Sequence, residues 1–484
     1  MALLDYHPLK VGRESIAGLN SVTLGLTGFV LLVSVYLFLE SWMAKGRFGP
    51  IRNSQGEPIK ELKGNSRVLK FASSVELSNV GKELAGDKPY IIHNGRVKEL
   101  VVVKPNHIQD FYKNDTKDHP KPRGLNMGEY FNRILGDAVG VQAGERWKVI
   151  RKYFDPEFAH GISMQALSKF SSLIHTWADE LQTTLMEQKA SCDNGETHEF
   201  TVDLTKSLRF LPFKLVAFQM YGEAFTEDLY NELLEINKIH EQILHDVILN
   251  NSLVSKLGNW IPSPPKKRMD LYLNRWKGFN LDIIQRAREF LHTLDEILFA
   301  NVDISSAVLS TLFSRLAANL AIQDALRDEI SQWTGSTTQY ISKQDTLLNC
   351  AIMESMRLTP AFAFSLPECT AAAKTIGGYT IPPNMPVVID AQRLNTDSAT
   401  WGEDSRLFRP ERFRALSSSQ CRYSFLRFGV GGASGKCMGR NVADLIFKLA
   451  VMIILQRYRL ISGRDDSTEK QGPSVSTDIR FVRI

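Results

Sequence analysis

The first 45 residues have a different hydrophobic pattern from the rest of the chain. From Ser15 to Leu39, 25 consecutive residues carry no charge, and Val22–Leu39 is almost entirely apolar. A helix of this length can cross the hydrocarbon core of a bilayer, which is about 30 Å thick. The segment is longer than a signal-peptide core and does not end in a small-residue cleavage site. The pattern predicts an uncleaved membrane anchor in residues 1–45, spanning about residues 20–42, ahead of a domain formed by residues 46–484.

The charges that flank this segment predict its orientation. Three basic residues follow the span, whereas the two that precede it are offset by acidic residues. Because basic residues tend to stay on the cytoplasmic side, the large C-terminal part is expected in the cytosol. The prediction is a single-pass protein of the endoplasmic reticulum membrane. A cleaved signal peptide and a buried helix of a soluble protein stay open as alternatives.

The remaining chain changes from short strands to helices and back. Short β-branched and aromatic runs around Asn94-Gly95 predict a small sheet within Val68–Val102. Helical spacing then dominates as far as Arg357, and Leu281–Leu320 is predicted to form one long central helix that is apolar on most faces. Two further strands and a last helix are predicted at Thr375–Thr380, Val387–Asp390 and Asn441–Gln456. The expected fold class is mainly α with small β-sheets.

Composition excludes several functional classes. The 484 residues are 43% hydrophobic and 23% charged, which is typical of a large globular core and not of a disordered chain. A net charge of +5 is too small to favour a dedicated nucleic-acid binder. The five cysteines are widely spaced, odd in number and free of any Cys-x-x-Cys pair, so neither a disulfide framework nor a zinc site is indicated.

The most informative segment is the glycine-rich stretch Phe428–Arg440, which places Cys437 at the start of an apolar helix. Glycines let the backbone approach a flat ligand closely, and a helix N-terminus stabilises a thiolate. A metal ligand is therefore favoured. A small buried cysteine is the alternative, and a phosphate-binding loop is disfavoured because the Gly-Lys-Ser/Thr ending is absent.

A charged pair precedes this loop. Glu354 and Arg357 are three residues apart, so they share one helix face and can form a charge-assisted hydrogen bond. The spacing alone is weak, because Glu411 and Arg414 share it. Without further context, a solvated surface pair explains the spacing equally well.

Four motifs in order make the chain resemble the cytochromes P450. The cysteine loop resembles their haem-binding loop, Glu354–Arg357 their ExxR pair, and Phe408–Phe413 their PERF element. Near the front, Gly144–Arg151 resembles their WxxxR helix. The resemblance implies the P450 fold, haem b (iron protoporphyrin IX), and Cys437 as the axial thiolate.

The same resemblance implies roles for further residues. Arg412 would join the Glu354/Arg357 pair behind the haem. The implied cofactor-binding residues are Trp147, Arg151, Phe428, Gly431, Lys436 and Gly439. The implied substrate pocket comprises Phe299, Ala300, Ile304, Phe362, Phe364 and Ser365.

The chain departs from the family pattern at several of these positions. The cysteine loop is longer than usual, and Gly435 stands where an arginine commonly contacts a propionate, with Arg427 as an alternative partner. Glu368 stands where the family commonly has a basic residue. On the long helix Asp303 fits the acid expected for proton delivery, but Ile304 replaces the oxygen-activating threonine. Ser305, about 100° further round the helix, is the candidate for the missing hydroxyl, and a purely structural bond is the alternative role for Asp303.

The resemblance also implies the reaction. Dioxygen would bind iron opposite Cys437, and electrons would come from NADPH through NADPH–cytochrome P450 reductase, with cytochrome b5 as a second donor. The amino-acid sequence of residues 298–303 and 364–368 resembles that of fungal secondary-metabolism enzymes, which suggests a small aromatic or diketopiperazine-like substrate. A haem-thiolate enzyme that couples, cyclises or rearranges its substrate without inserting oxygen is the alternative. A cofactor-free membrane scaffold is the third hypothesis.

Overall fold

The structure divides into two compact units, Met1–Ile51 and Arg52–Ile484, and the second carries the elements described below. This computed structural model describes residues 31, 34–35, 48–95, 97–112, 119–190, 199–222, 225–249, 263–287, 294–430, 436–463 and 478–484. The predicted anchor lies outside the described residues. Within the described part of the chain, no single helix has the length and hydropathy to cross a bilayer. The stretches 304–318 and 320–332 meet this criterion only as a pair, with a 104° bend between them.

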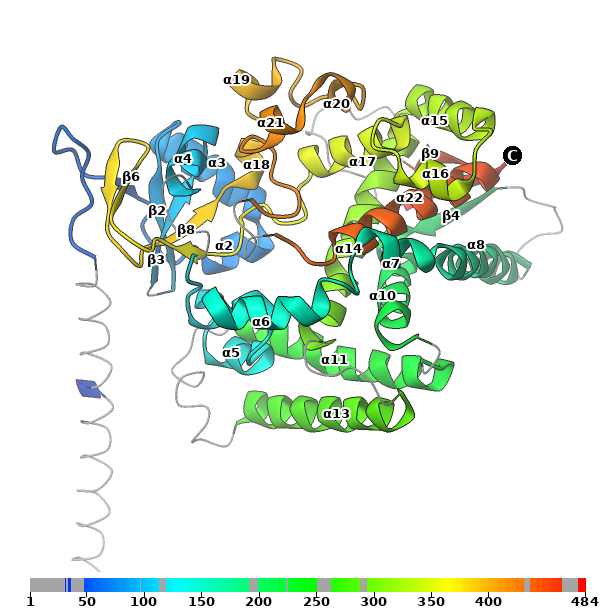
Figure 1. The fold of residues 1–484 in the computed structure, drawn as a ribbon, viewed down its shortest axis with the longest axis horizontal. Coiled ribbons are helices and arrows are strands. Elements are labelled where there is room, and N and C mark those ends of the chain that lie inside the picture. Colours follow the sequence, from blue (N-terminus) through cyan, green and yellow to red (C-terminus); the bar gives the residue numbers. More distant parts are fainter. Residues whose placement is uncertain are drawn as a thin grey trace, which may run out of the picture. The chain divides into compact units, whose positions relative to one another are not determined.

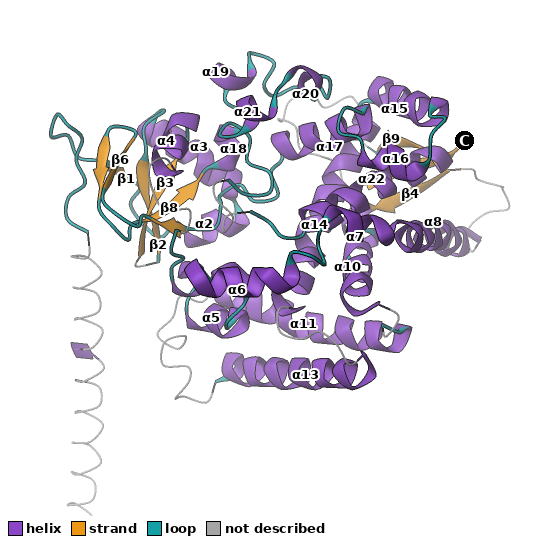
Figure 2. Ribbon diagram, viewed as in Figure 1, coloured by secondary structure: helices purple, strands orange, loops and turns teal. Residues whose placement is uncertain are grey.

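The larger sheet has five strands, in the order β1-β2-β3-β8-β5 (Figure 2). As predicted, two β-branched runs form a hairpin around Asn94-Gly95, and Gly95 takes a positive φ of 65° there. The central strand β3 pairs antiparallel with β2 and in parallel with β8, so both of its edges are hydrogen-bonded. It is fully buried from Leu100 to Val102. Its strands are β1 (Lys60–Glu61), β2 (Tyr90–Asn94), β3 (Val97–Val102), β5 (Glu368–Cys369) and β8 (Pro386–Ile389).

The other described strands form two smaller sheets. A three-stranded sheet has the order β4-β10-β9, with β4 (Glu199–Asp203), β9 (Tyr458–Ser462) and β10 (Asp478–Arg483). The segment Thr375–Thr380 was expected to be one strand, but it contains the turn of a hairpin between β6 (Lys374–Ile376) and β7 (Tyr379–Ile381). Gly377 and Gly378 have φ values of 55° and 84°, so they reverse the chain where a continuous strand was expected.

Helices form most of the rest of the molecule, as predicted (Figure 1). Before the long central helix, they are α2 (Arg67–Ala72), α3 (Ser74–Ala85), α4 (Pro105–Tyr112), η1 (Arg123–Asn126), α5 (Glu129–Leu135), η2 (Val139–Val141), α6 (Gly144–Phe154), α7 (His160–Gln165), α8 (Leu167–Ala190), α9 (Leu204–Ser207), α10 (Leu211–Tyr221), α11 (Glu227–Leu249) and α13 (Pro264–Ala287). After it come α15 (Leu320–Gln332), α16 (Thr337–Ser342), α17 (Leu347–Leu358), α18 (Ala391–Leu394), α19 (Ser398–Trp401), α20 (Arg412–Ala415), α21 (Ser418–Cys421) and α22 (Arg440–Arg457).

The central helix is α14 (Leu294–Ala318), which packs against α10, α17 and β9. It is shorter than the single helix predicted for Leu281–Leu320. Residues 281–287 belong to α13, residues 288–293 lie outside the description, and Leu320 already starts α15. The last helix, α22, confirms its prediction and is buried along most of its length. The core therefore lies around two helices: α14, whose first half carries candidate site residues, and α22, which follows Cys437.

A buried carboxylate joins the large sheet to its covering helices. Asp390 follows β8, accepts a hydrogen bond from the backbone N–H of Arg393 at the start of α18, and accepts another from the Ser78 hydroxyl of α3 at 2.8 Å. Its side chain is fully buried, and burial raises its pKa to about 6 despite these hydrogen bonds. Between pH 4 and 6 the folded state therefore holds a proton that the unfolded chain releases.

The raised pKa of Asp390 predicts that the free energy of unfolding falls as the pH rises from 4 to 6. Above pH 6 the folded state carries a buried charge, which at 1.36 kcal/mol per pKa unit costs about 2–3 kcal/mol. Asp390→Asn keeps an acceptor for the helix cap but carries no charge. We expect urea unfolding of this variant to depend less on pH between 4 and 7 than that of the parent protein. Equal pH dependence in both proteins would contradict the shift.

Candidate functional site

The Glu354/Arg357 pair predicted from the sequence is a fully buried hydrogen-bonded centre on α17. Arg357 Nε donates to Glu354 Oε2 at 2.7 Å, and Arg357 Nη2 donates to Oε1 at 2.8 Å. Neither side chain has exposed surface. Arg412, at the start of α20, donates from Nε to the same Oε1 at 2.9 Å. The structure thus brings together all three residues of the predicted structural motif, and the solvated-pair alternative is wrong.

Backbone groups that no sequence pattern indicated complete this centre. Arg357 Nη1 donates to the carbonyl oxygens of Asn395 and Ser405, each at 2.7 Å. The backbone N–H of Arg409 donates to Glu354 Oε1 at 3.0 Å, so this oxygen accepts three hydrogen bonds. The guanidinium of Arg357 also lies 5.0 Å from the ring centre of Trp401. The centre therefore fixes the loop between α18 and α20 against α17.

Cys437 lies three residues before α22, at the N-terminal end of that buried helix. Its thiol-bearing side chain is exposed, and its backbone N–H donates to the carbonyl oxygen of Phe428 at 2.8 Å. This bond brings together the two ends of the glycine-rich loop. Lys436 is exposed and Gly439 is the N-terminal cap position of α22. Gly431 lies outside the described residues.

The WxxxR motif lies on α6, as the resemblance implied. Trp147 and Arg151 are buried, and the guanidinium of Arg151 lies 5.3 Å from the Trp147 ring centre. Arg151 Nη1 donates to the carbonyl oxygen of Lys436 at 3.3 Å, which connects this helix with the cysteine loop. Arg151 Nε forms an ion pair with Oδ1 of Asp155 at 2.5 Å.

These residues fit a haem with a thiolate ligand. An exposed cysteine at a helix N-terminus is a donor that iron accepts, since the helix dipole favours the thiolate. The buried Arg151 guanidinium has five donor hydrogens, and its contacts with Lys436 and Asp155 do not use all of them, so it can also bind a propionate carboxylate. Arg427, the alternative propionate partner, forms an ion pair with Asp444 of α22 and lies over the Phe428 ring.

The candidate distal residues lie on α14. The side chains of Phe299, Ala300 and Asp303 lie outside the description, although their backbone is helical. Ile304 is half-buried and Ser305 is buried, with 3% of its surface exposed. The helix is therefore continuous where the sequence departs from the family pattern.

The segment after α17 contains the other predicted pocket residues. Phe362 is exposed, whereas Phe364 is buried in the apolar cluster of the large sheet. The Ser365 hydroxyl accepts a hydrogen bond from the Ile389 N–H at 2.9 Å and donates to the Leu366 carbonyl oxygen at 3.1 Å. Phe364 and Ser365 therefore have packing and hydrogen-bonding roles in the sheet.

Glu368, at the position where the family commonly has a basic residue, lies on β5. Burial raises its pKa to about 7, although nearby Lys121 and a hydrogen bond with Tyr112 oppose the shift. The ammonium of Lys121 also donates to the Gly140 carbonyl oxygen at 2.8 Å. A carboxyl group with such a pKa is partly protonated at neutral pH. It therefore does not supply the positive charge of the basic residue that the family commonly has at this position.

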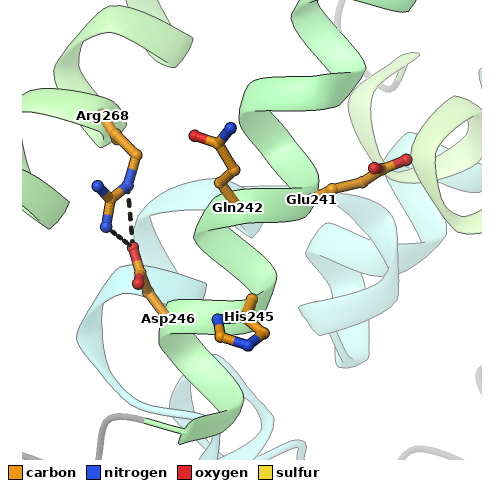
Figure 3. A pocket seen from close by; sticks show the side chains of 5 residues that line it. All are labelled: Glu241, Gln242, His245, Asp246 and Arg268. Carbon is orange, nitrogen blue, oxygen red and sulfur yellow. Dashed lines mark hydrogen bonds and ion pairs between the residues drawn. The ribbon is translucent and has the colours of Figure 1, made fainter.

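A polar hollow of about 400 Å³ lies between α11 and α13 (Figure 3). Its lining residues are Glu241, Gln242, His245, Asp246 and Arg268. Arg268 donates from Nε to Asp246 Oδ2 at 3.1 Å, and Glu241 accepts from the Asn237 amide at 2.7 Å. None of the predicted substrate residues lines this hollow, so it is separate from the predicted pocket.

Comparisons with known proteins agree with this geometry. The family model described as Cytochrome P450 matches residues 87–292 and 286–480. Cytochrome P450 monooxygenase apdB of Emericella nidulans is 47% identical to this chain, over 94% of this chain and 95% of its own. Cytochrome P450 monooxygenases opdB of Penicillium oxalicum and lepD of Aspergillus flavus are 41% and 35% identical, each over 94% of this chain and over 93% and 95% of their own lengths.

Together these matches cover almost the whole of the described domain. The family implies a haem-thiolate iron cofactor, dioxygen, a small-molecule substrate and a redox partner. The predicted enzyme class, an oxidoreductase of the monooxygenase type, is confirmed. The chain belongs to the cytochrome P450 family.

Proposed function

We propose that this chain oxidises a small secondary metabolite, with Cys437 as the axial ligand of haem b. The observation that carries the proposal is the position of Cys437: exposed, just before α22, with its N–H held by the Phe428 carbonyl oxygen. When bound, the haem supplies dioxygen activation, and donation from the thiolate promotes O–O cleavage. The protein supplies the ligand, the orientation of the substrate and the protons.

The described side chains have separate tasks in this mechanism. Cys437 would supply a thiolate ligand to the iron, and the N-terminus of α22 would stabilise that negative charge. Arg151 would bind a propionate carboxylate with donor hydrogens that its contacts with Lys436 and Asp155 do not use. Ser305 on α14 would hold or pass a proton. Asp303 is the proposed source of that proton.

The electron donor and the location extend the same proposal. Electrons come from NADPH through NADPH–cytochrome P450 reductase, with cytochrome b5 as a second donor. Residues 1–45 anchor the protein in the endoplasmic reticulum membrane, with the catalytic domain in the cytosol. The uncharged stretch Ser15–Leu39 and the basic residues that follow it support this location.

The substrate class is a small aromatic or diketopiperazine-like molecule. Phe362 supports this choice, because the residue is 47% exposed on the segment that the family uses for its substrate pocket. The comparisons with fungal monooxygenases support secondary metabolism as the setting. Coupling, ring formation or rearrangement without oxygen insertion is the alternative reaction.

Turnover under ¹⁸O₂ with purified reductase and NADPH tests the proposal. Extracts of the source organism that lack this protein supply candidate substrates, and mass spectrometry follows the products. Incorporation of one ¹⁸O atom per product supports monooxygenation. Products that form only with NADPH and oxygen but contain no ¹⁸O would favour the alternative reaction.

Ser305 offers a prediction about coupling of electron use to product. Ser305→Ala removes the only hydroxyl proposed for proton delivery, so we expect several-fold more NADPH electrons to end in hydrogen peroxide. Ile304→Thr is expected to give little gain, because Ser305 already supplies the hydroxyl. Peroxide and product per NADPH are the quantities to measure.

A matched control comes from the same helix. Ser314 is buried and donates to the Ser310 carbonyl oxygen at 2.8 Å, so Ser314→Ala removes a comparable hydroxyl that donates within its own helix. We expect its coupling to stay at the parent value. Unchanged coupling in Ser305→Ala would instead assign proton delivery to water held by Asn301 and Asp303.

The exposed basic residues of α6 predict where the reductase docks. Lys148 and Lys152, with Lys436 and Arg440 beside the cysteine, would steer an acidic partner. Reversing Lys148 and Lys152 to Glu should slow reductase-driven turnover severalfold at low salt and less at high salt. Peroxide-driven turnover should be unaffected.

Lys238→Glu on α11 controls for a change of surface charge. Lys238 pairs with Glu235 three residues earlier, as Lys148 pairs with Glu145. The control variant should turn over at the parent rate in both assays. Equal losses in the reductase and peroxide assays of the α6 variant would indicate a defect in haem binding and would contradict docking at this face.

A further inference from the structure

The peptide unit that joins Lys436 to Cys437 is held at both of its polar ends. Arg151 Nη1 donates to its carbonyl oxygen at 3.3 Å, and its N–H donates to the Phe428 carbonyl oxygen at 2.8 Å. These two groups belong to the same rigid plane. Two hydrogen bonds on opposite edges of one plane restrict its rotation, and with it the position of the Cys437 backbone that carries the thiol.

The bond from Arg151 has a charged donor in a buried setting. Arg151 is 9% exposed, and hydrogen bonds from ionised donors are about twice as strong as those between neutral groups. Donation to the carbonyl oxygen also polarises the amide and strengthens its N–H as a donor. The two bonds therefore support each other.

Asp155 holds the guanidinium that makes this bond. It is the C-terminal cap residue of α6, and its backbone N–H donates to the Arg151 carbonyl oxygen at 2.8 Å. Its carboxylate forms the ion pair with Arg151 Nε at 2.5 Å. Because the backbone and the side chain of Asp155 both bond to Arg151, the residue restricts the directions that the guanidinium can take.

A second contact joins the same two segments of the chain. The side-chain amide of Asn441, in the first turn of α22, donates to the Phe158 carbonyl oxygen at 2.8 Å. Phe158 is buried four residues after the end of α6. The two segments are thus linked on both sides of Cys437, once through Lys436 and once through Asn441.

We propose that Arg151 and Asp155 are positioning residues for the axial thiolate, in addition to any bond from Arg151 to a haem propionate. This inference rests on the proposed role of Cys437. A guanidinium has five donor hydrogens in a planar fork, so Arg151 can hold the Lys436 carbonyl oxygen through Nη1 and Asp155 through Nε and still have a donor for a propionate. The two bonds predict different defects. Loss of the propionate bond would lower the haem content, whereas loss of the bond to the Lys436 carbonyl oxygen would disturb the position of the Cys437 thiolate.

Arg151→Lys and Asp155→Asn test the inference in the holoenzyme. Lysine keeps the charge but cannot reach both groups with one planar fork. We expect the ratio of thiolate-type to thiol-type absorption in the reduced-CO spectrum to fall about tenfold for Arg151→Lys, as for loss of one charge-assisted hydrogen bond. Asp155→Asn should lower the ratio severalfold while the haem content per protein stays at the parent value.

Asp137→Asn is the matched control, because Asp137 forms an ion pair with another arginine of α6. Asp137 pairs with Arg146 of α6 at 2.8 Å, and both side chains are largely exposed, so this variant removes an ion pair that does not involve the cysteine loop. Its spectrum should equal that of the parent. Amide hydrogen exchange of the peptide that contains Cys437 should be faster in Arg151→Lys and unchanged in Asp137→Asn.

The outcomes separate the inference from the proposed function. If Arg151→Lys loses haem but keeps the parent ratio and exchange rate, Arg151 acts on the propionate alone and the inference is wrong. If Asp155→Asn behaves like Asp137→Asn, Asp155 has no positioning role. A parent protein without a thiolate-type band would contradict the role of Cys437 itself.

Discussion

Cys437→Ala is expected to abolish the thiolate-type band in the reduced-CO spectrum. The substitution removes the proposed anionic ligand of the iron, and no other cysteine of the sequence follows a glycine-rich stretch. Burial raises the pKa of the Cys350 and Cys421 thiols, so these groups are disfavoured as thiolates. The absorption spectrum and the haem content of the purified protein are the measurements.

Cys421→Ala is the matched control, because it removes a half-buried cysteine from the cluster around Trp401. Its spectrum should keep the full thiolate-type band. Cys437→Ser separates loss of the ligand from loss of volume, since serine retains the side-chain size. A full band in Cys437→Ala would show that another group ligates the iron.

The sequence predicted the helical class and the order of motifs because both depend on local patterns. The hairpin around Asn94-Gly95 was predicted from the β-branched and aromatic runs on either side of it, and the last helix from its helical spacing. The hairpin at Gly377-Gly378 was missed because the residues on both sides of the two glycines were assigned to one strand, while positive φ at both glycines reverses the chain. The prediction failed where one turn outweighed the propensity of its neighbours.

The candidate site shows a similar limit. The spacing of Glu354 and Arg357 predicted their bond, which is local. The carbonyl oxygens of Asn395 and Ser405 could not be predicted, because any residue has a carbonyl group and only the fold brings these two to Arg357. The bond from Arg151 to Lys436 was missed for the same reason.

Glu354→Ala and Arg357→Ala are expected to cost about 3–5 kcal/mol each, because each leaves a buried charge without its partner. Glu354→Ala is the more severe change, since its carboxylate binds Arg357, Arg412 and the backbone N–H of Arg409. A loss of this size approaches the whole stability of many domains. We therefore expect little folded, haem-loaded protein, measured as soluble yield and haem content.

Arg357→Lys keeps the charge and helps to separate electrostatics from geometry. Lysine cannot donate at once to Glu354 and to the carbonyl oxygens of Asn395 and Ser405. This variant should fold in part, with an unfolding midpoint in urea below that of the parent. A midpoint equal to the parent value would mean that charge alone sustains the centre.

Glu411 offers a control with the same sequence spacing, because it stands three residues before Arg414. Arg414 instead pairs with Glu329 at 3.2 Å, and Glu411 is exposed, so Glu411→Ala removes a carboxylate that solvent screens. Its yield, haem content and unfolding midpoint should match the parent. Equal behaviour of Glu354→Ala and Glu411→Ala would contradict the buried centre, because the two positions differ in burial and partners and not in spacing.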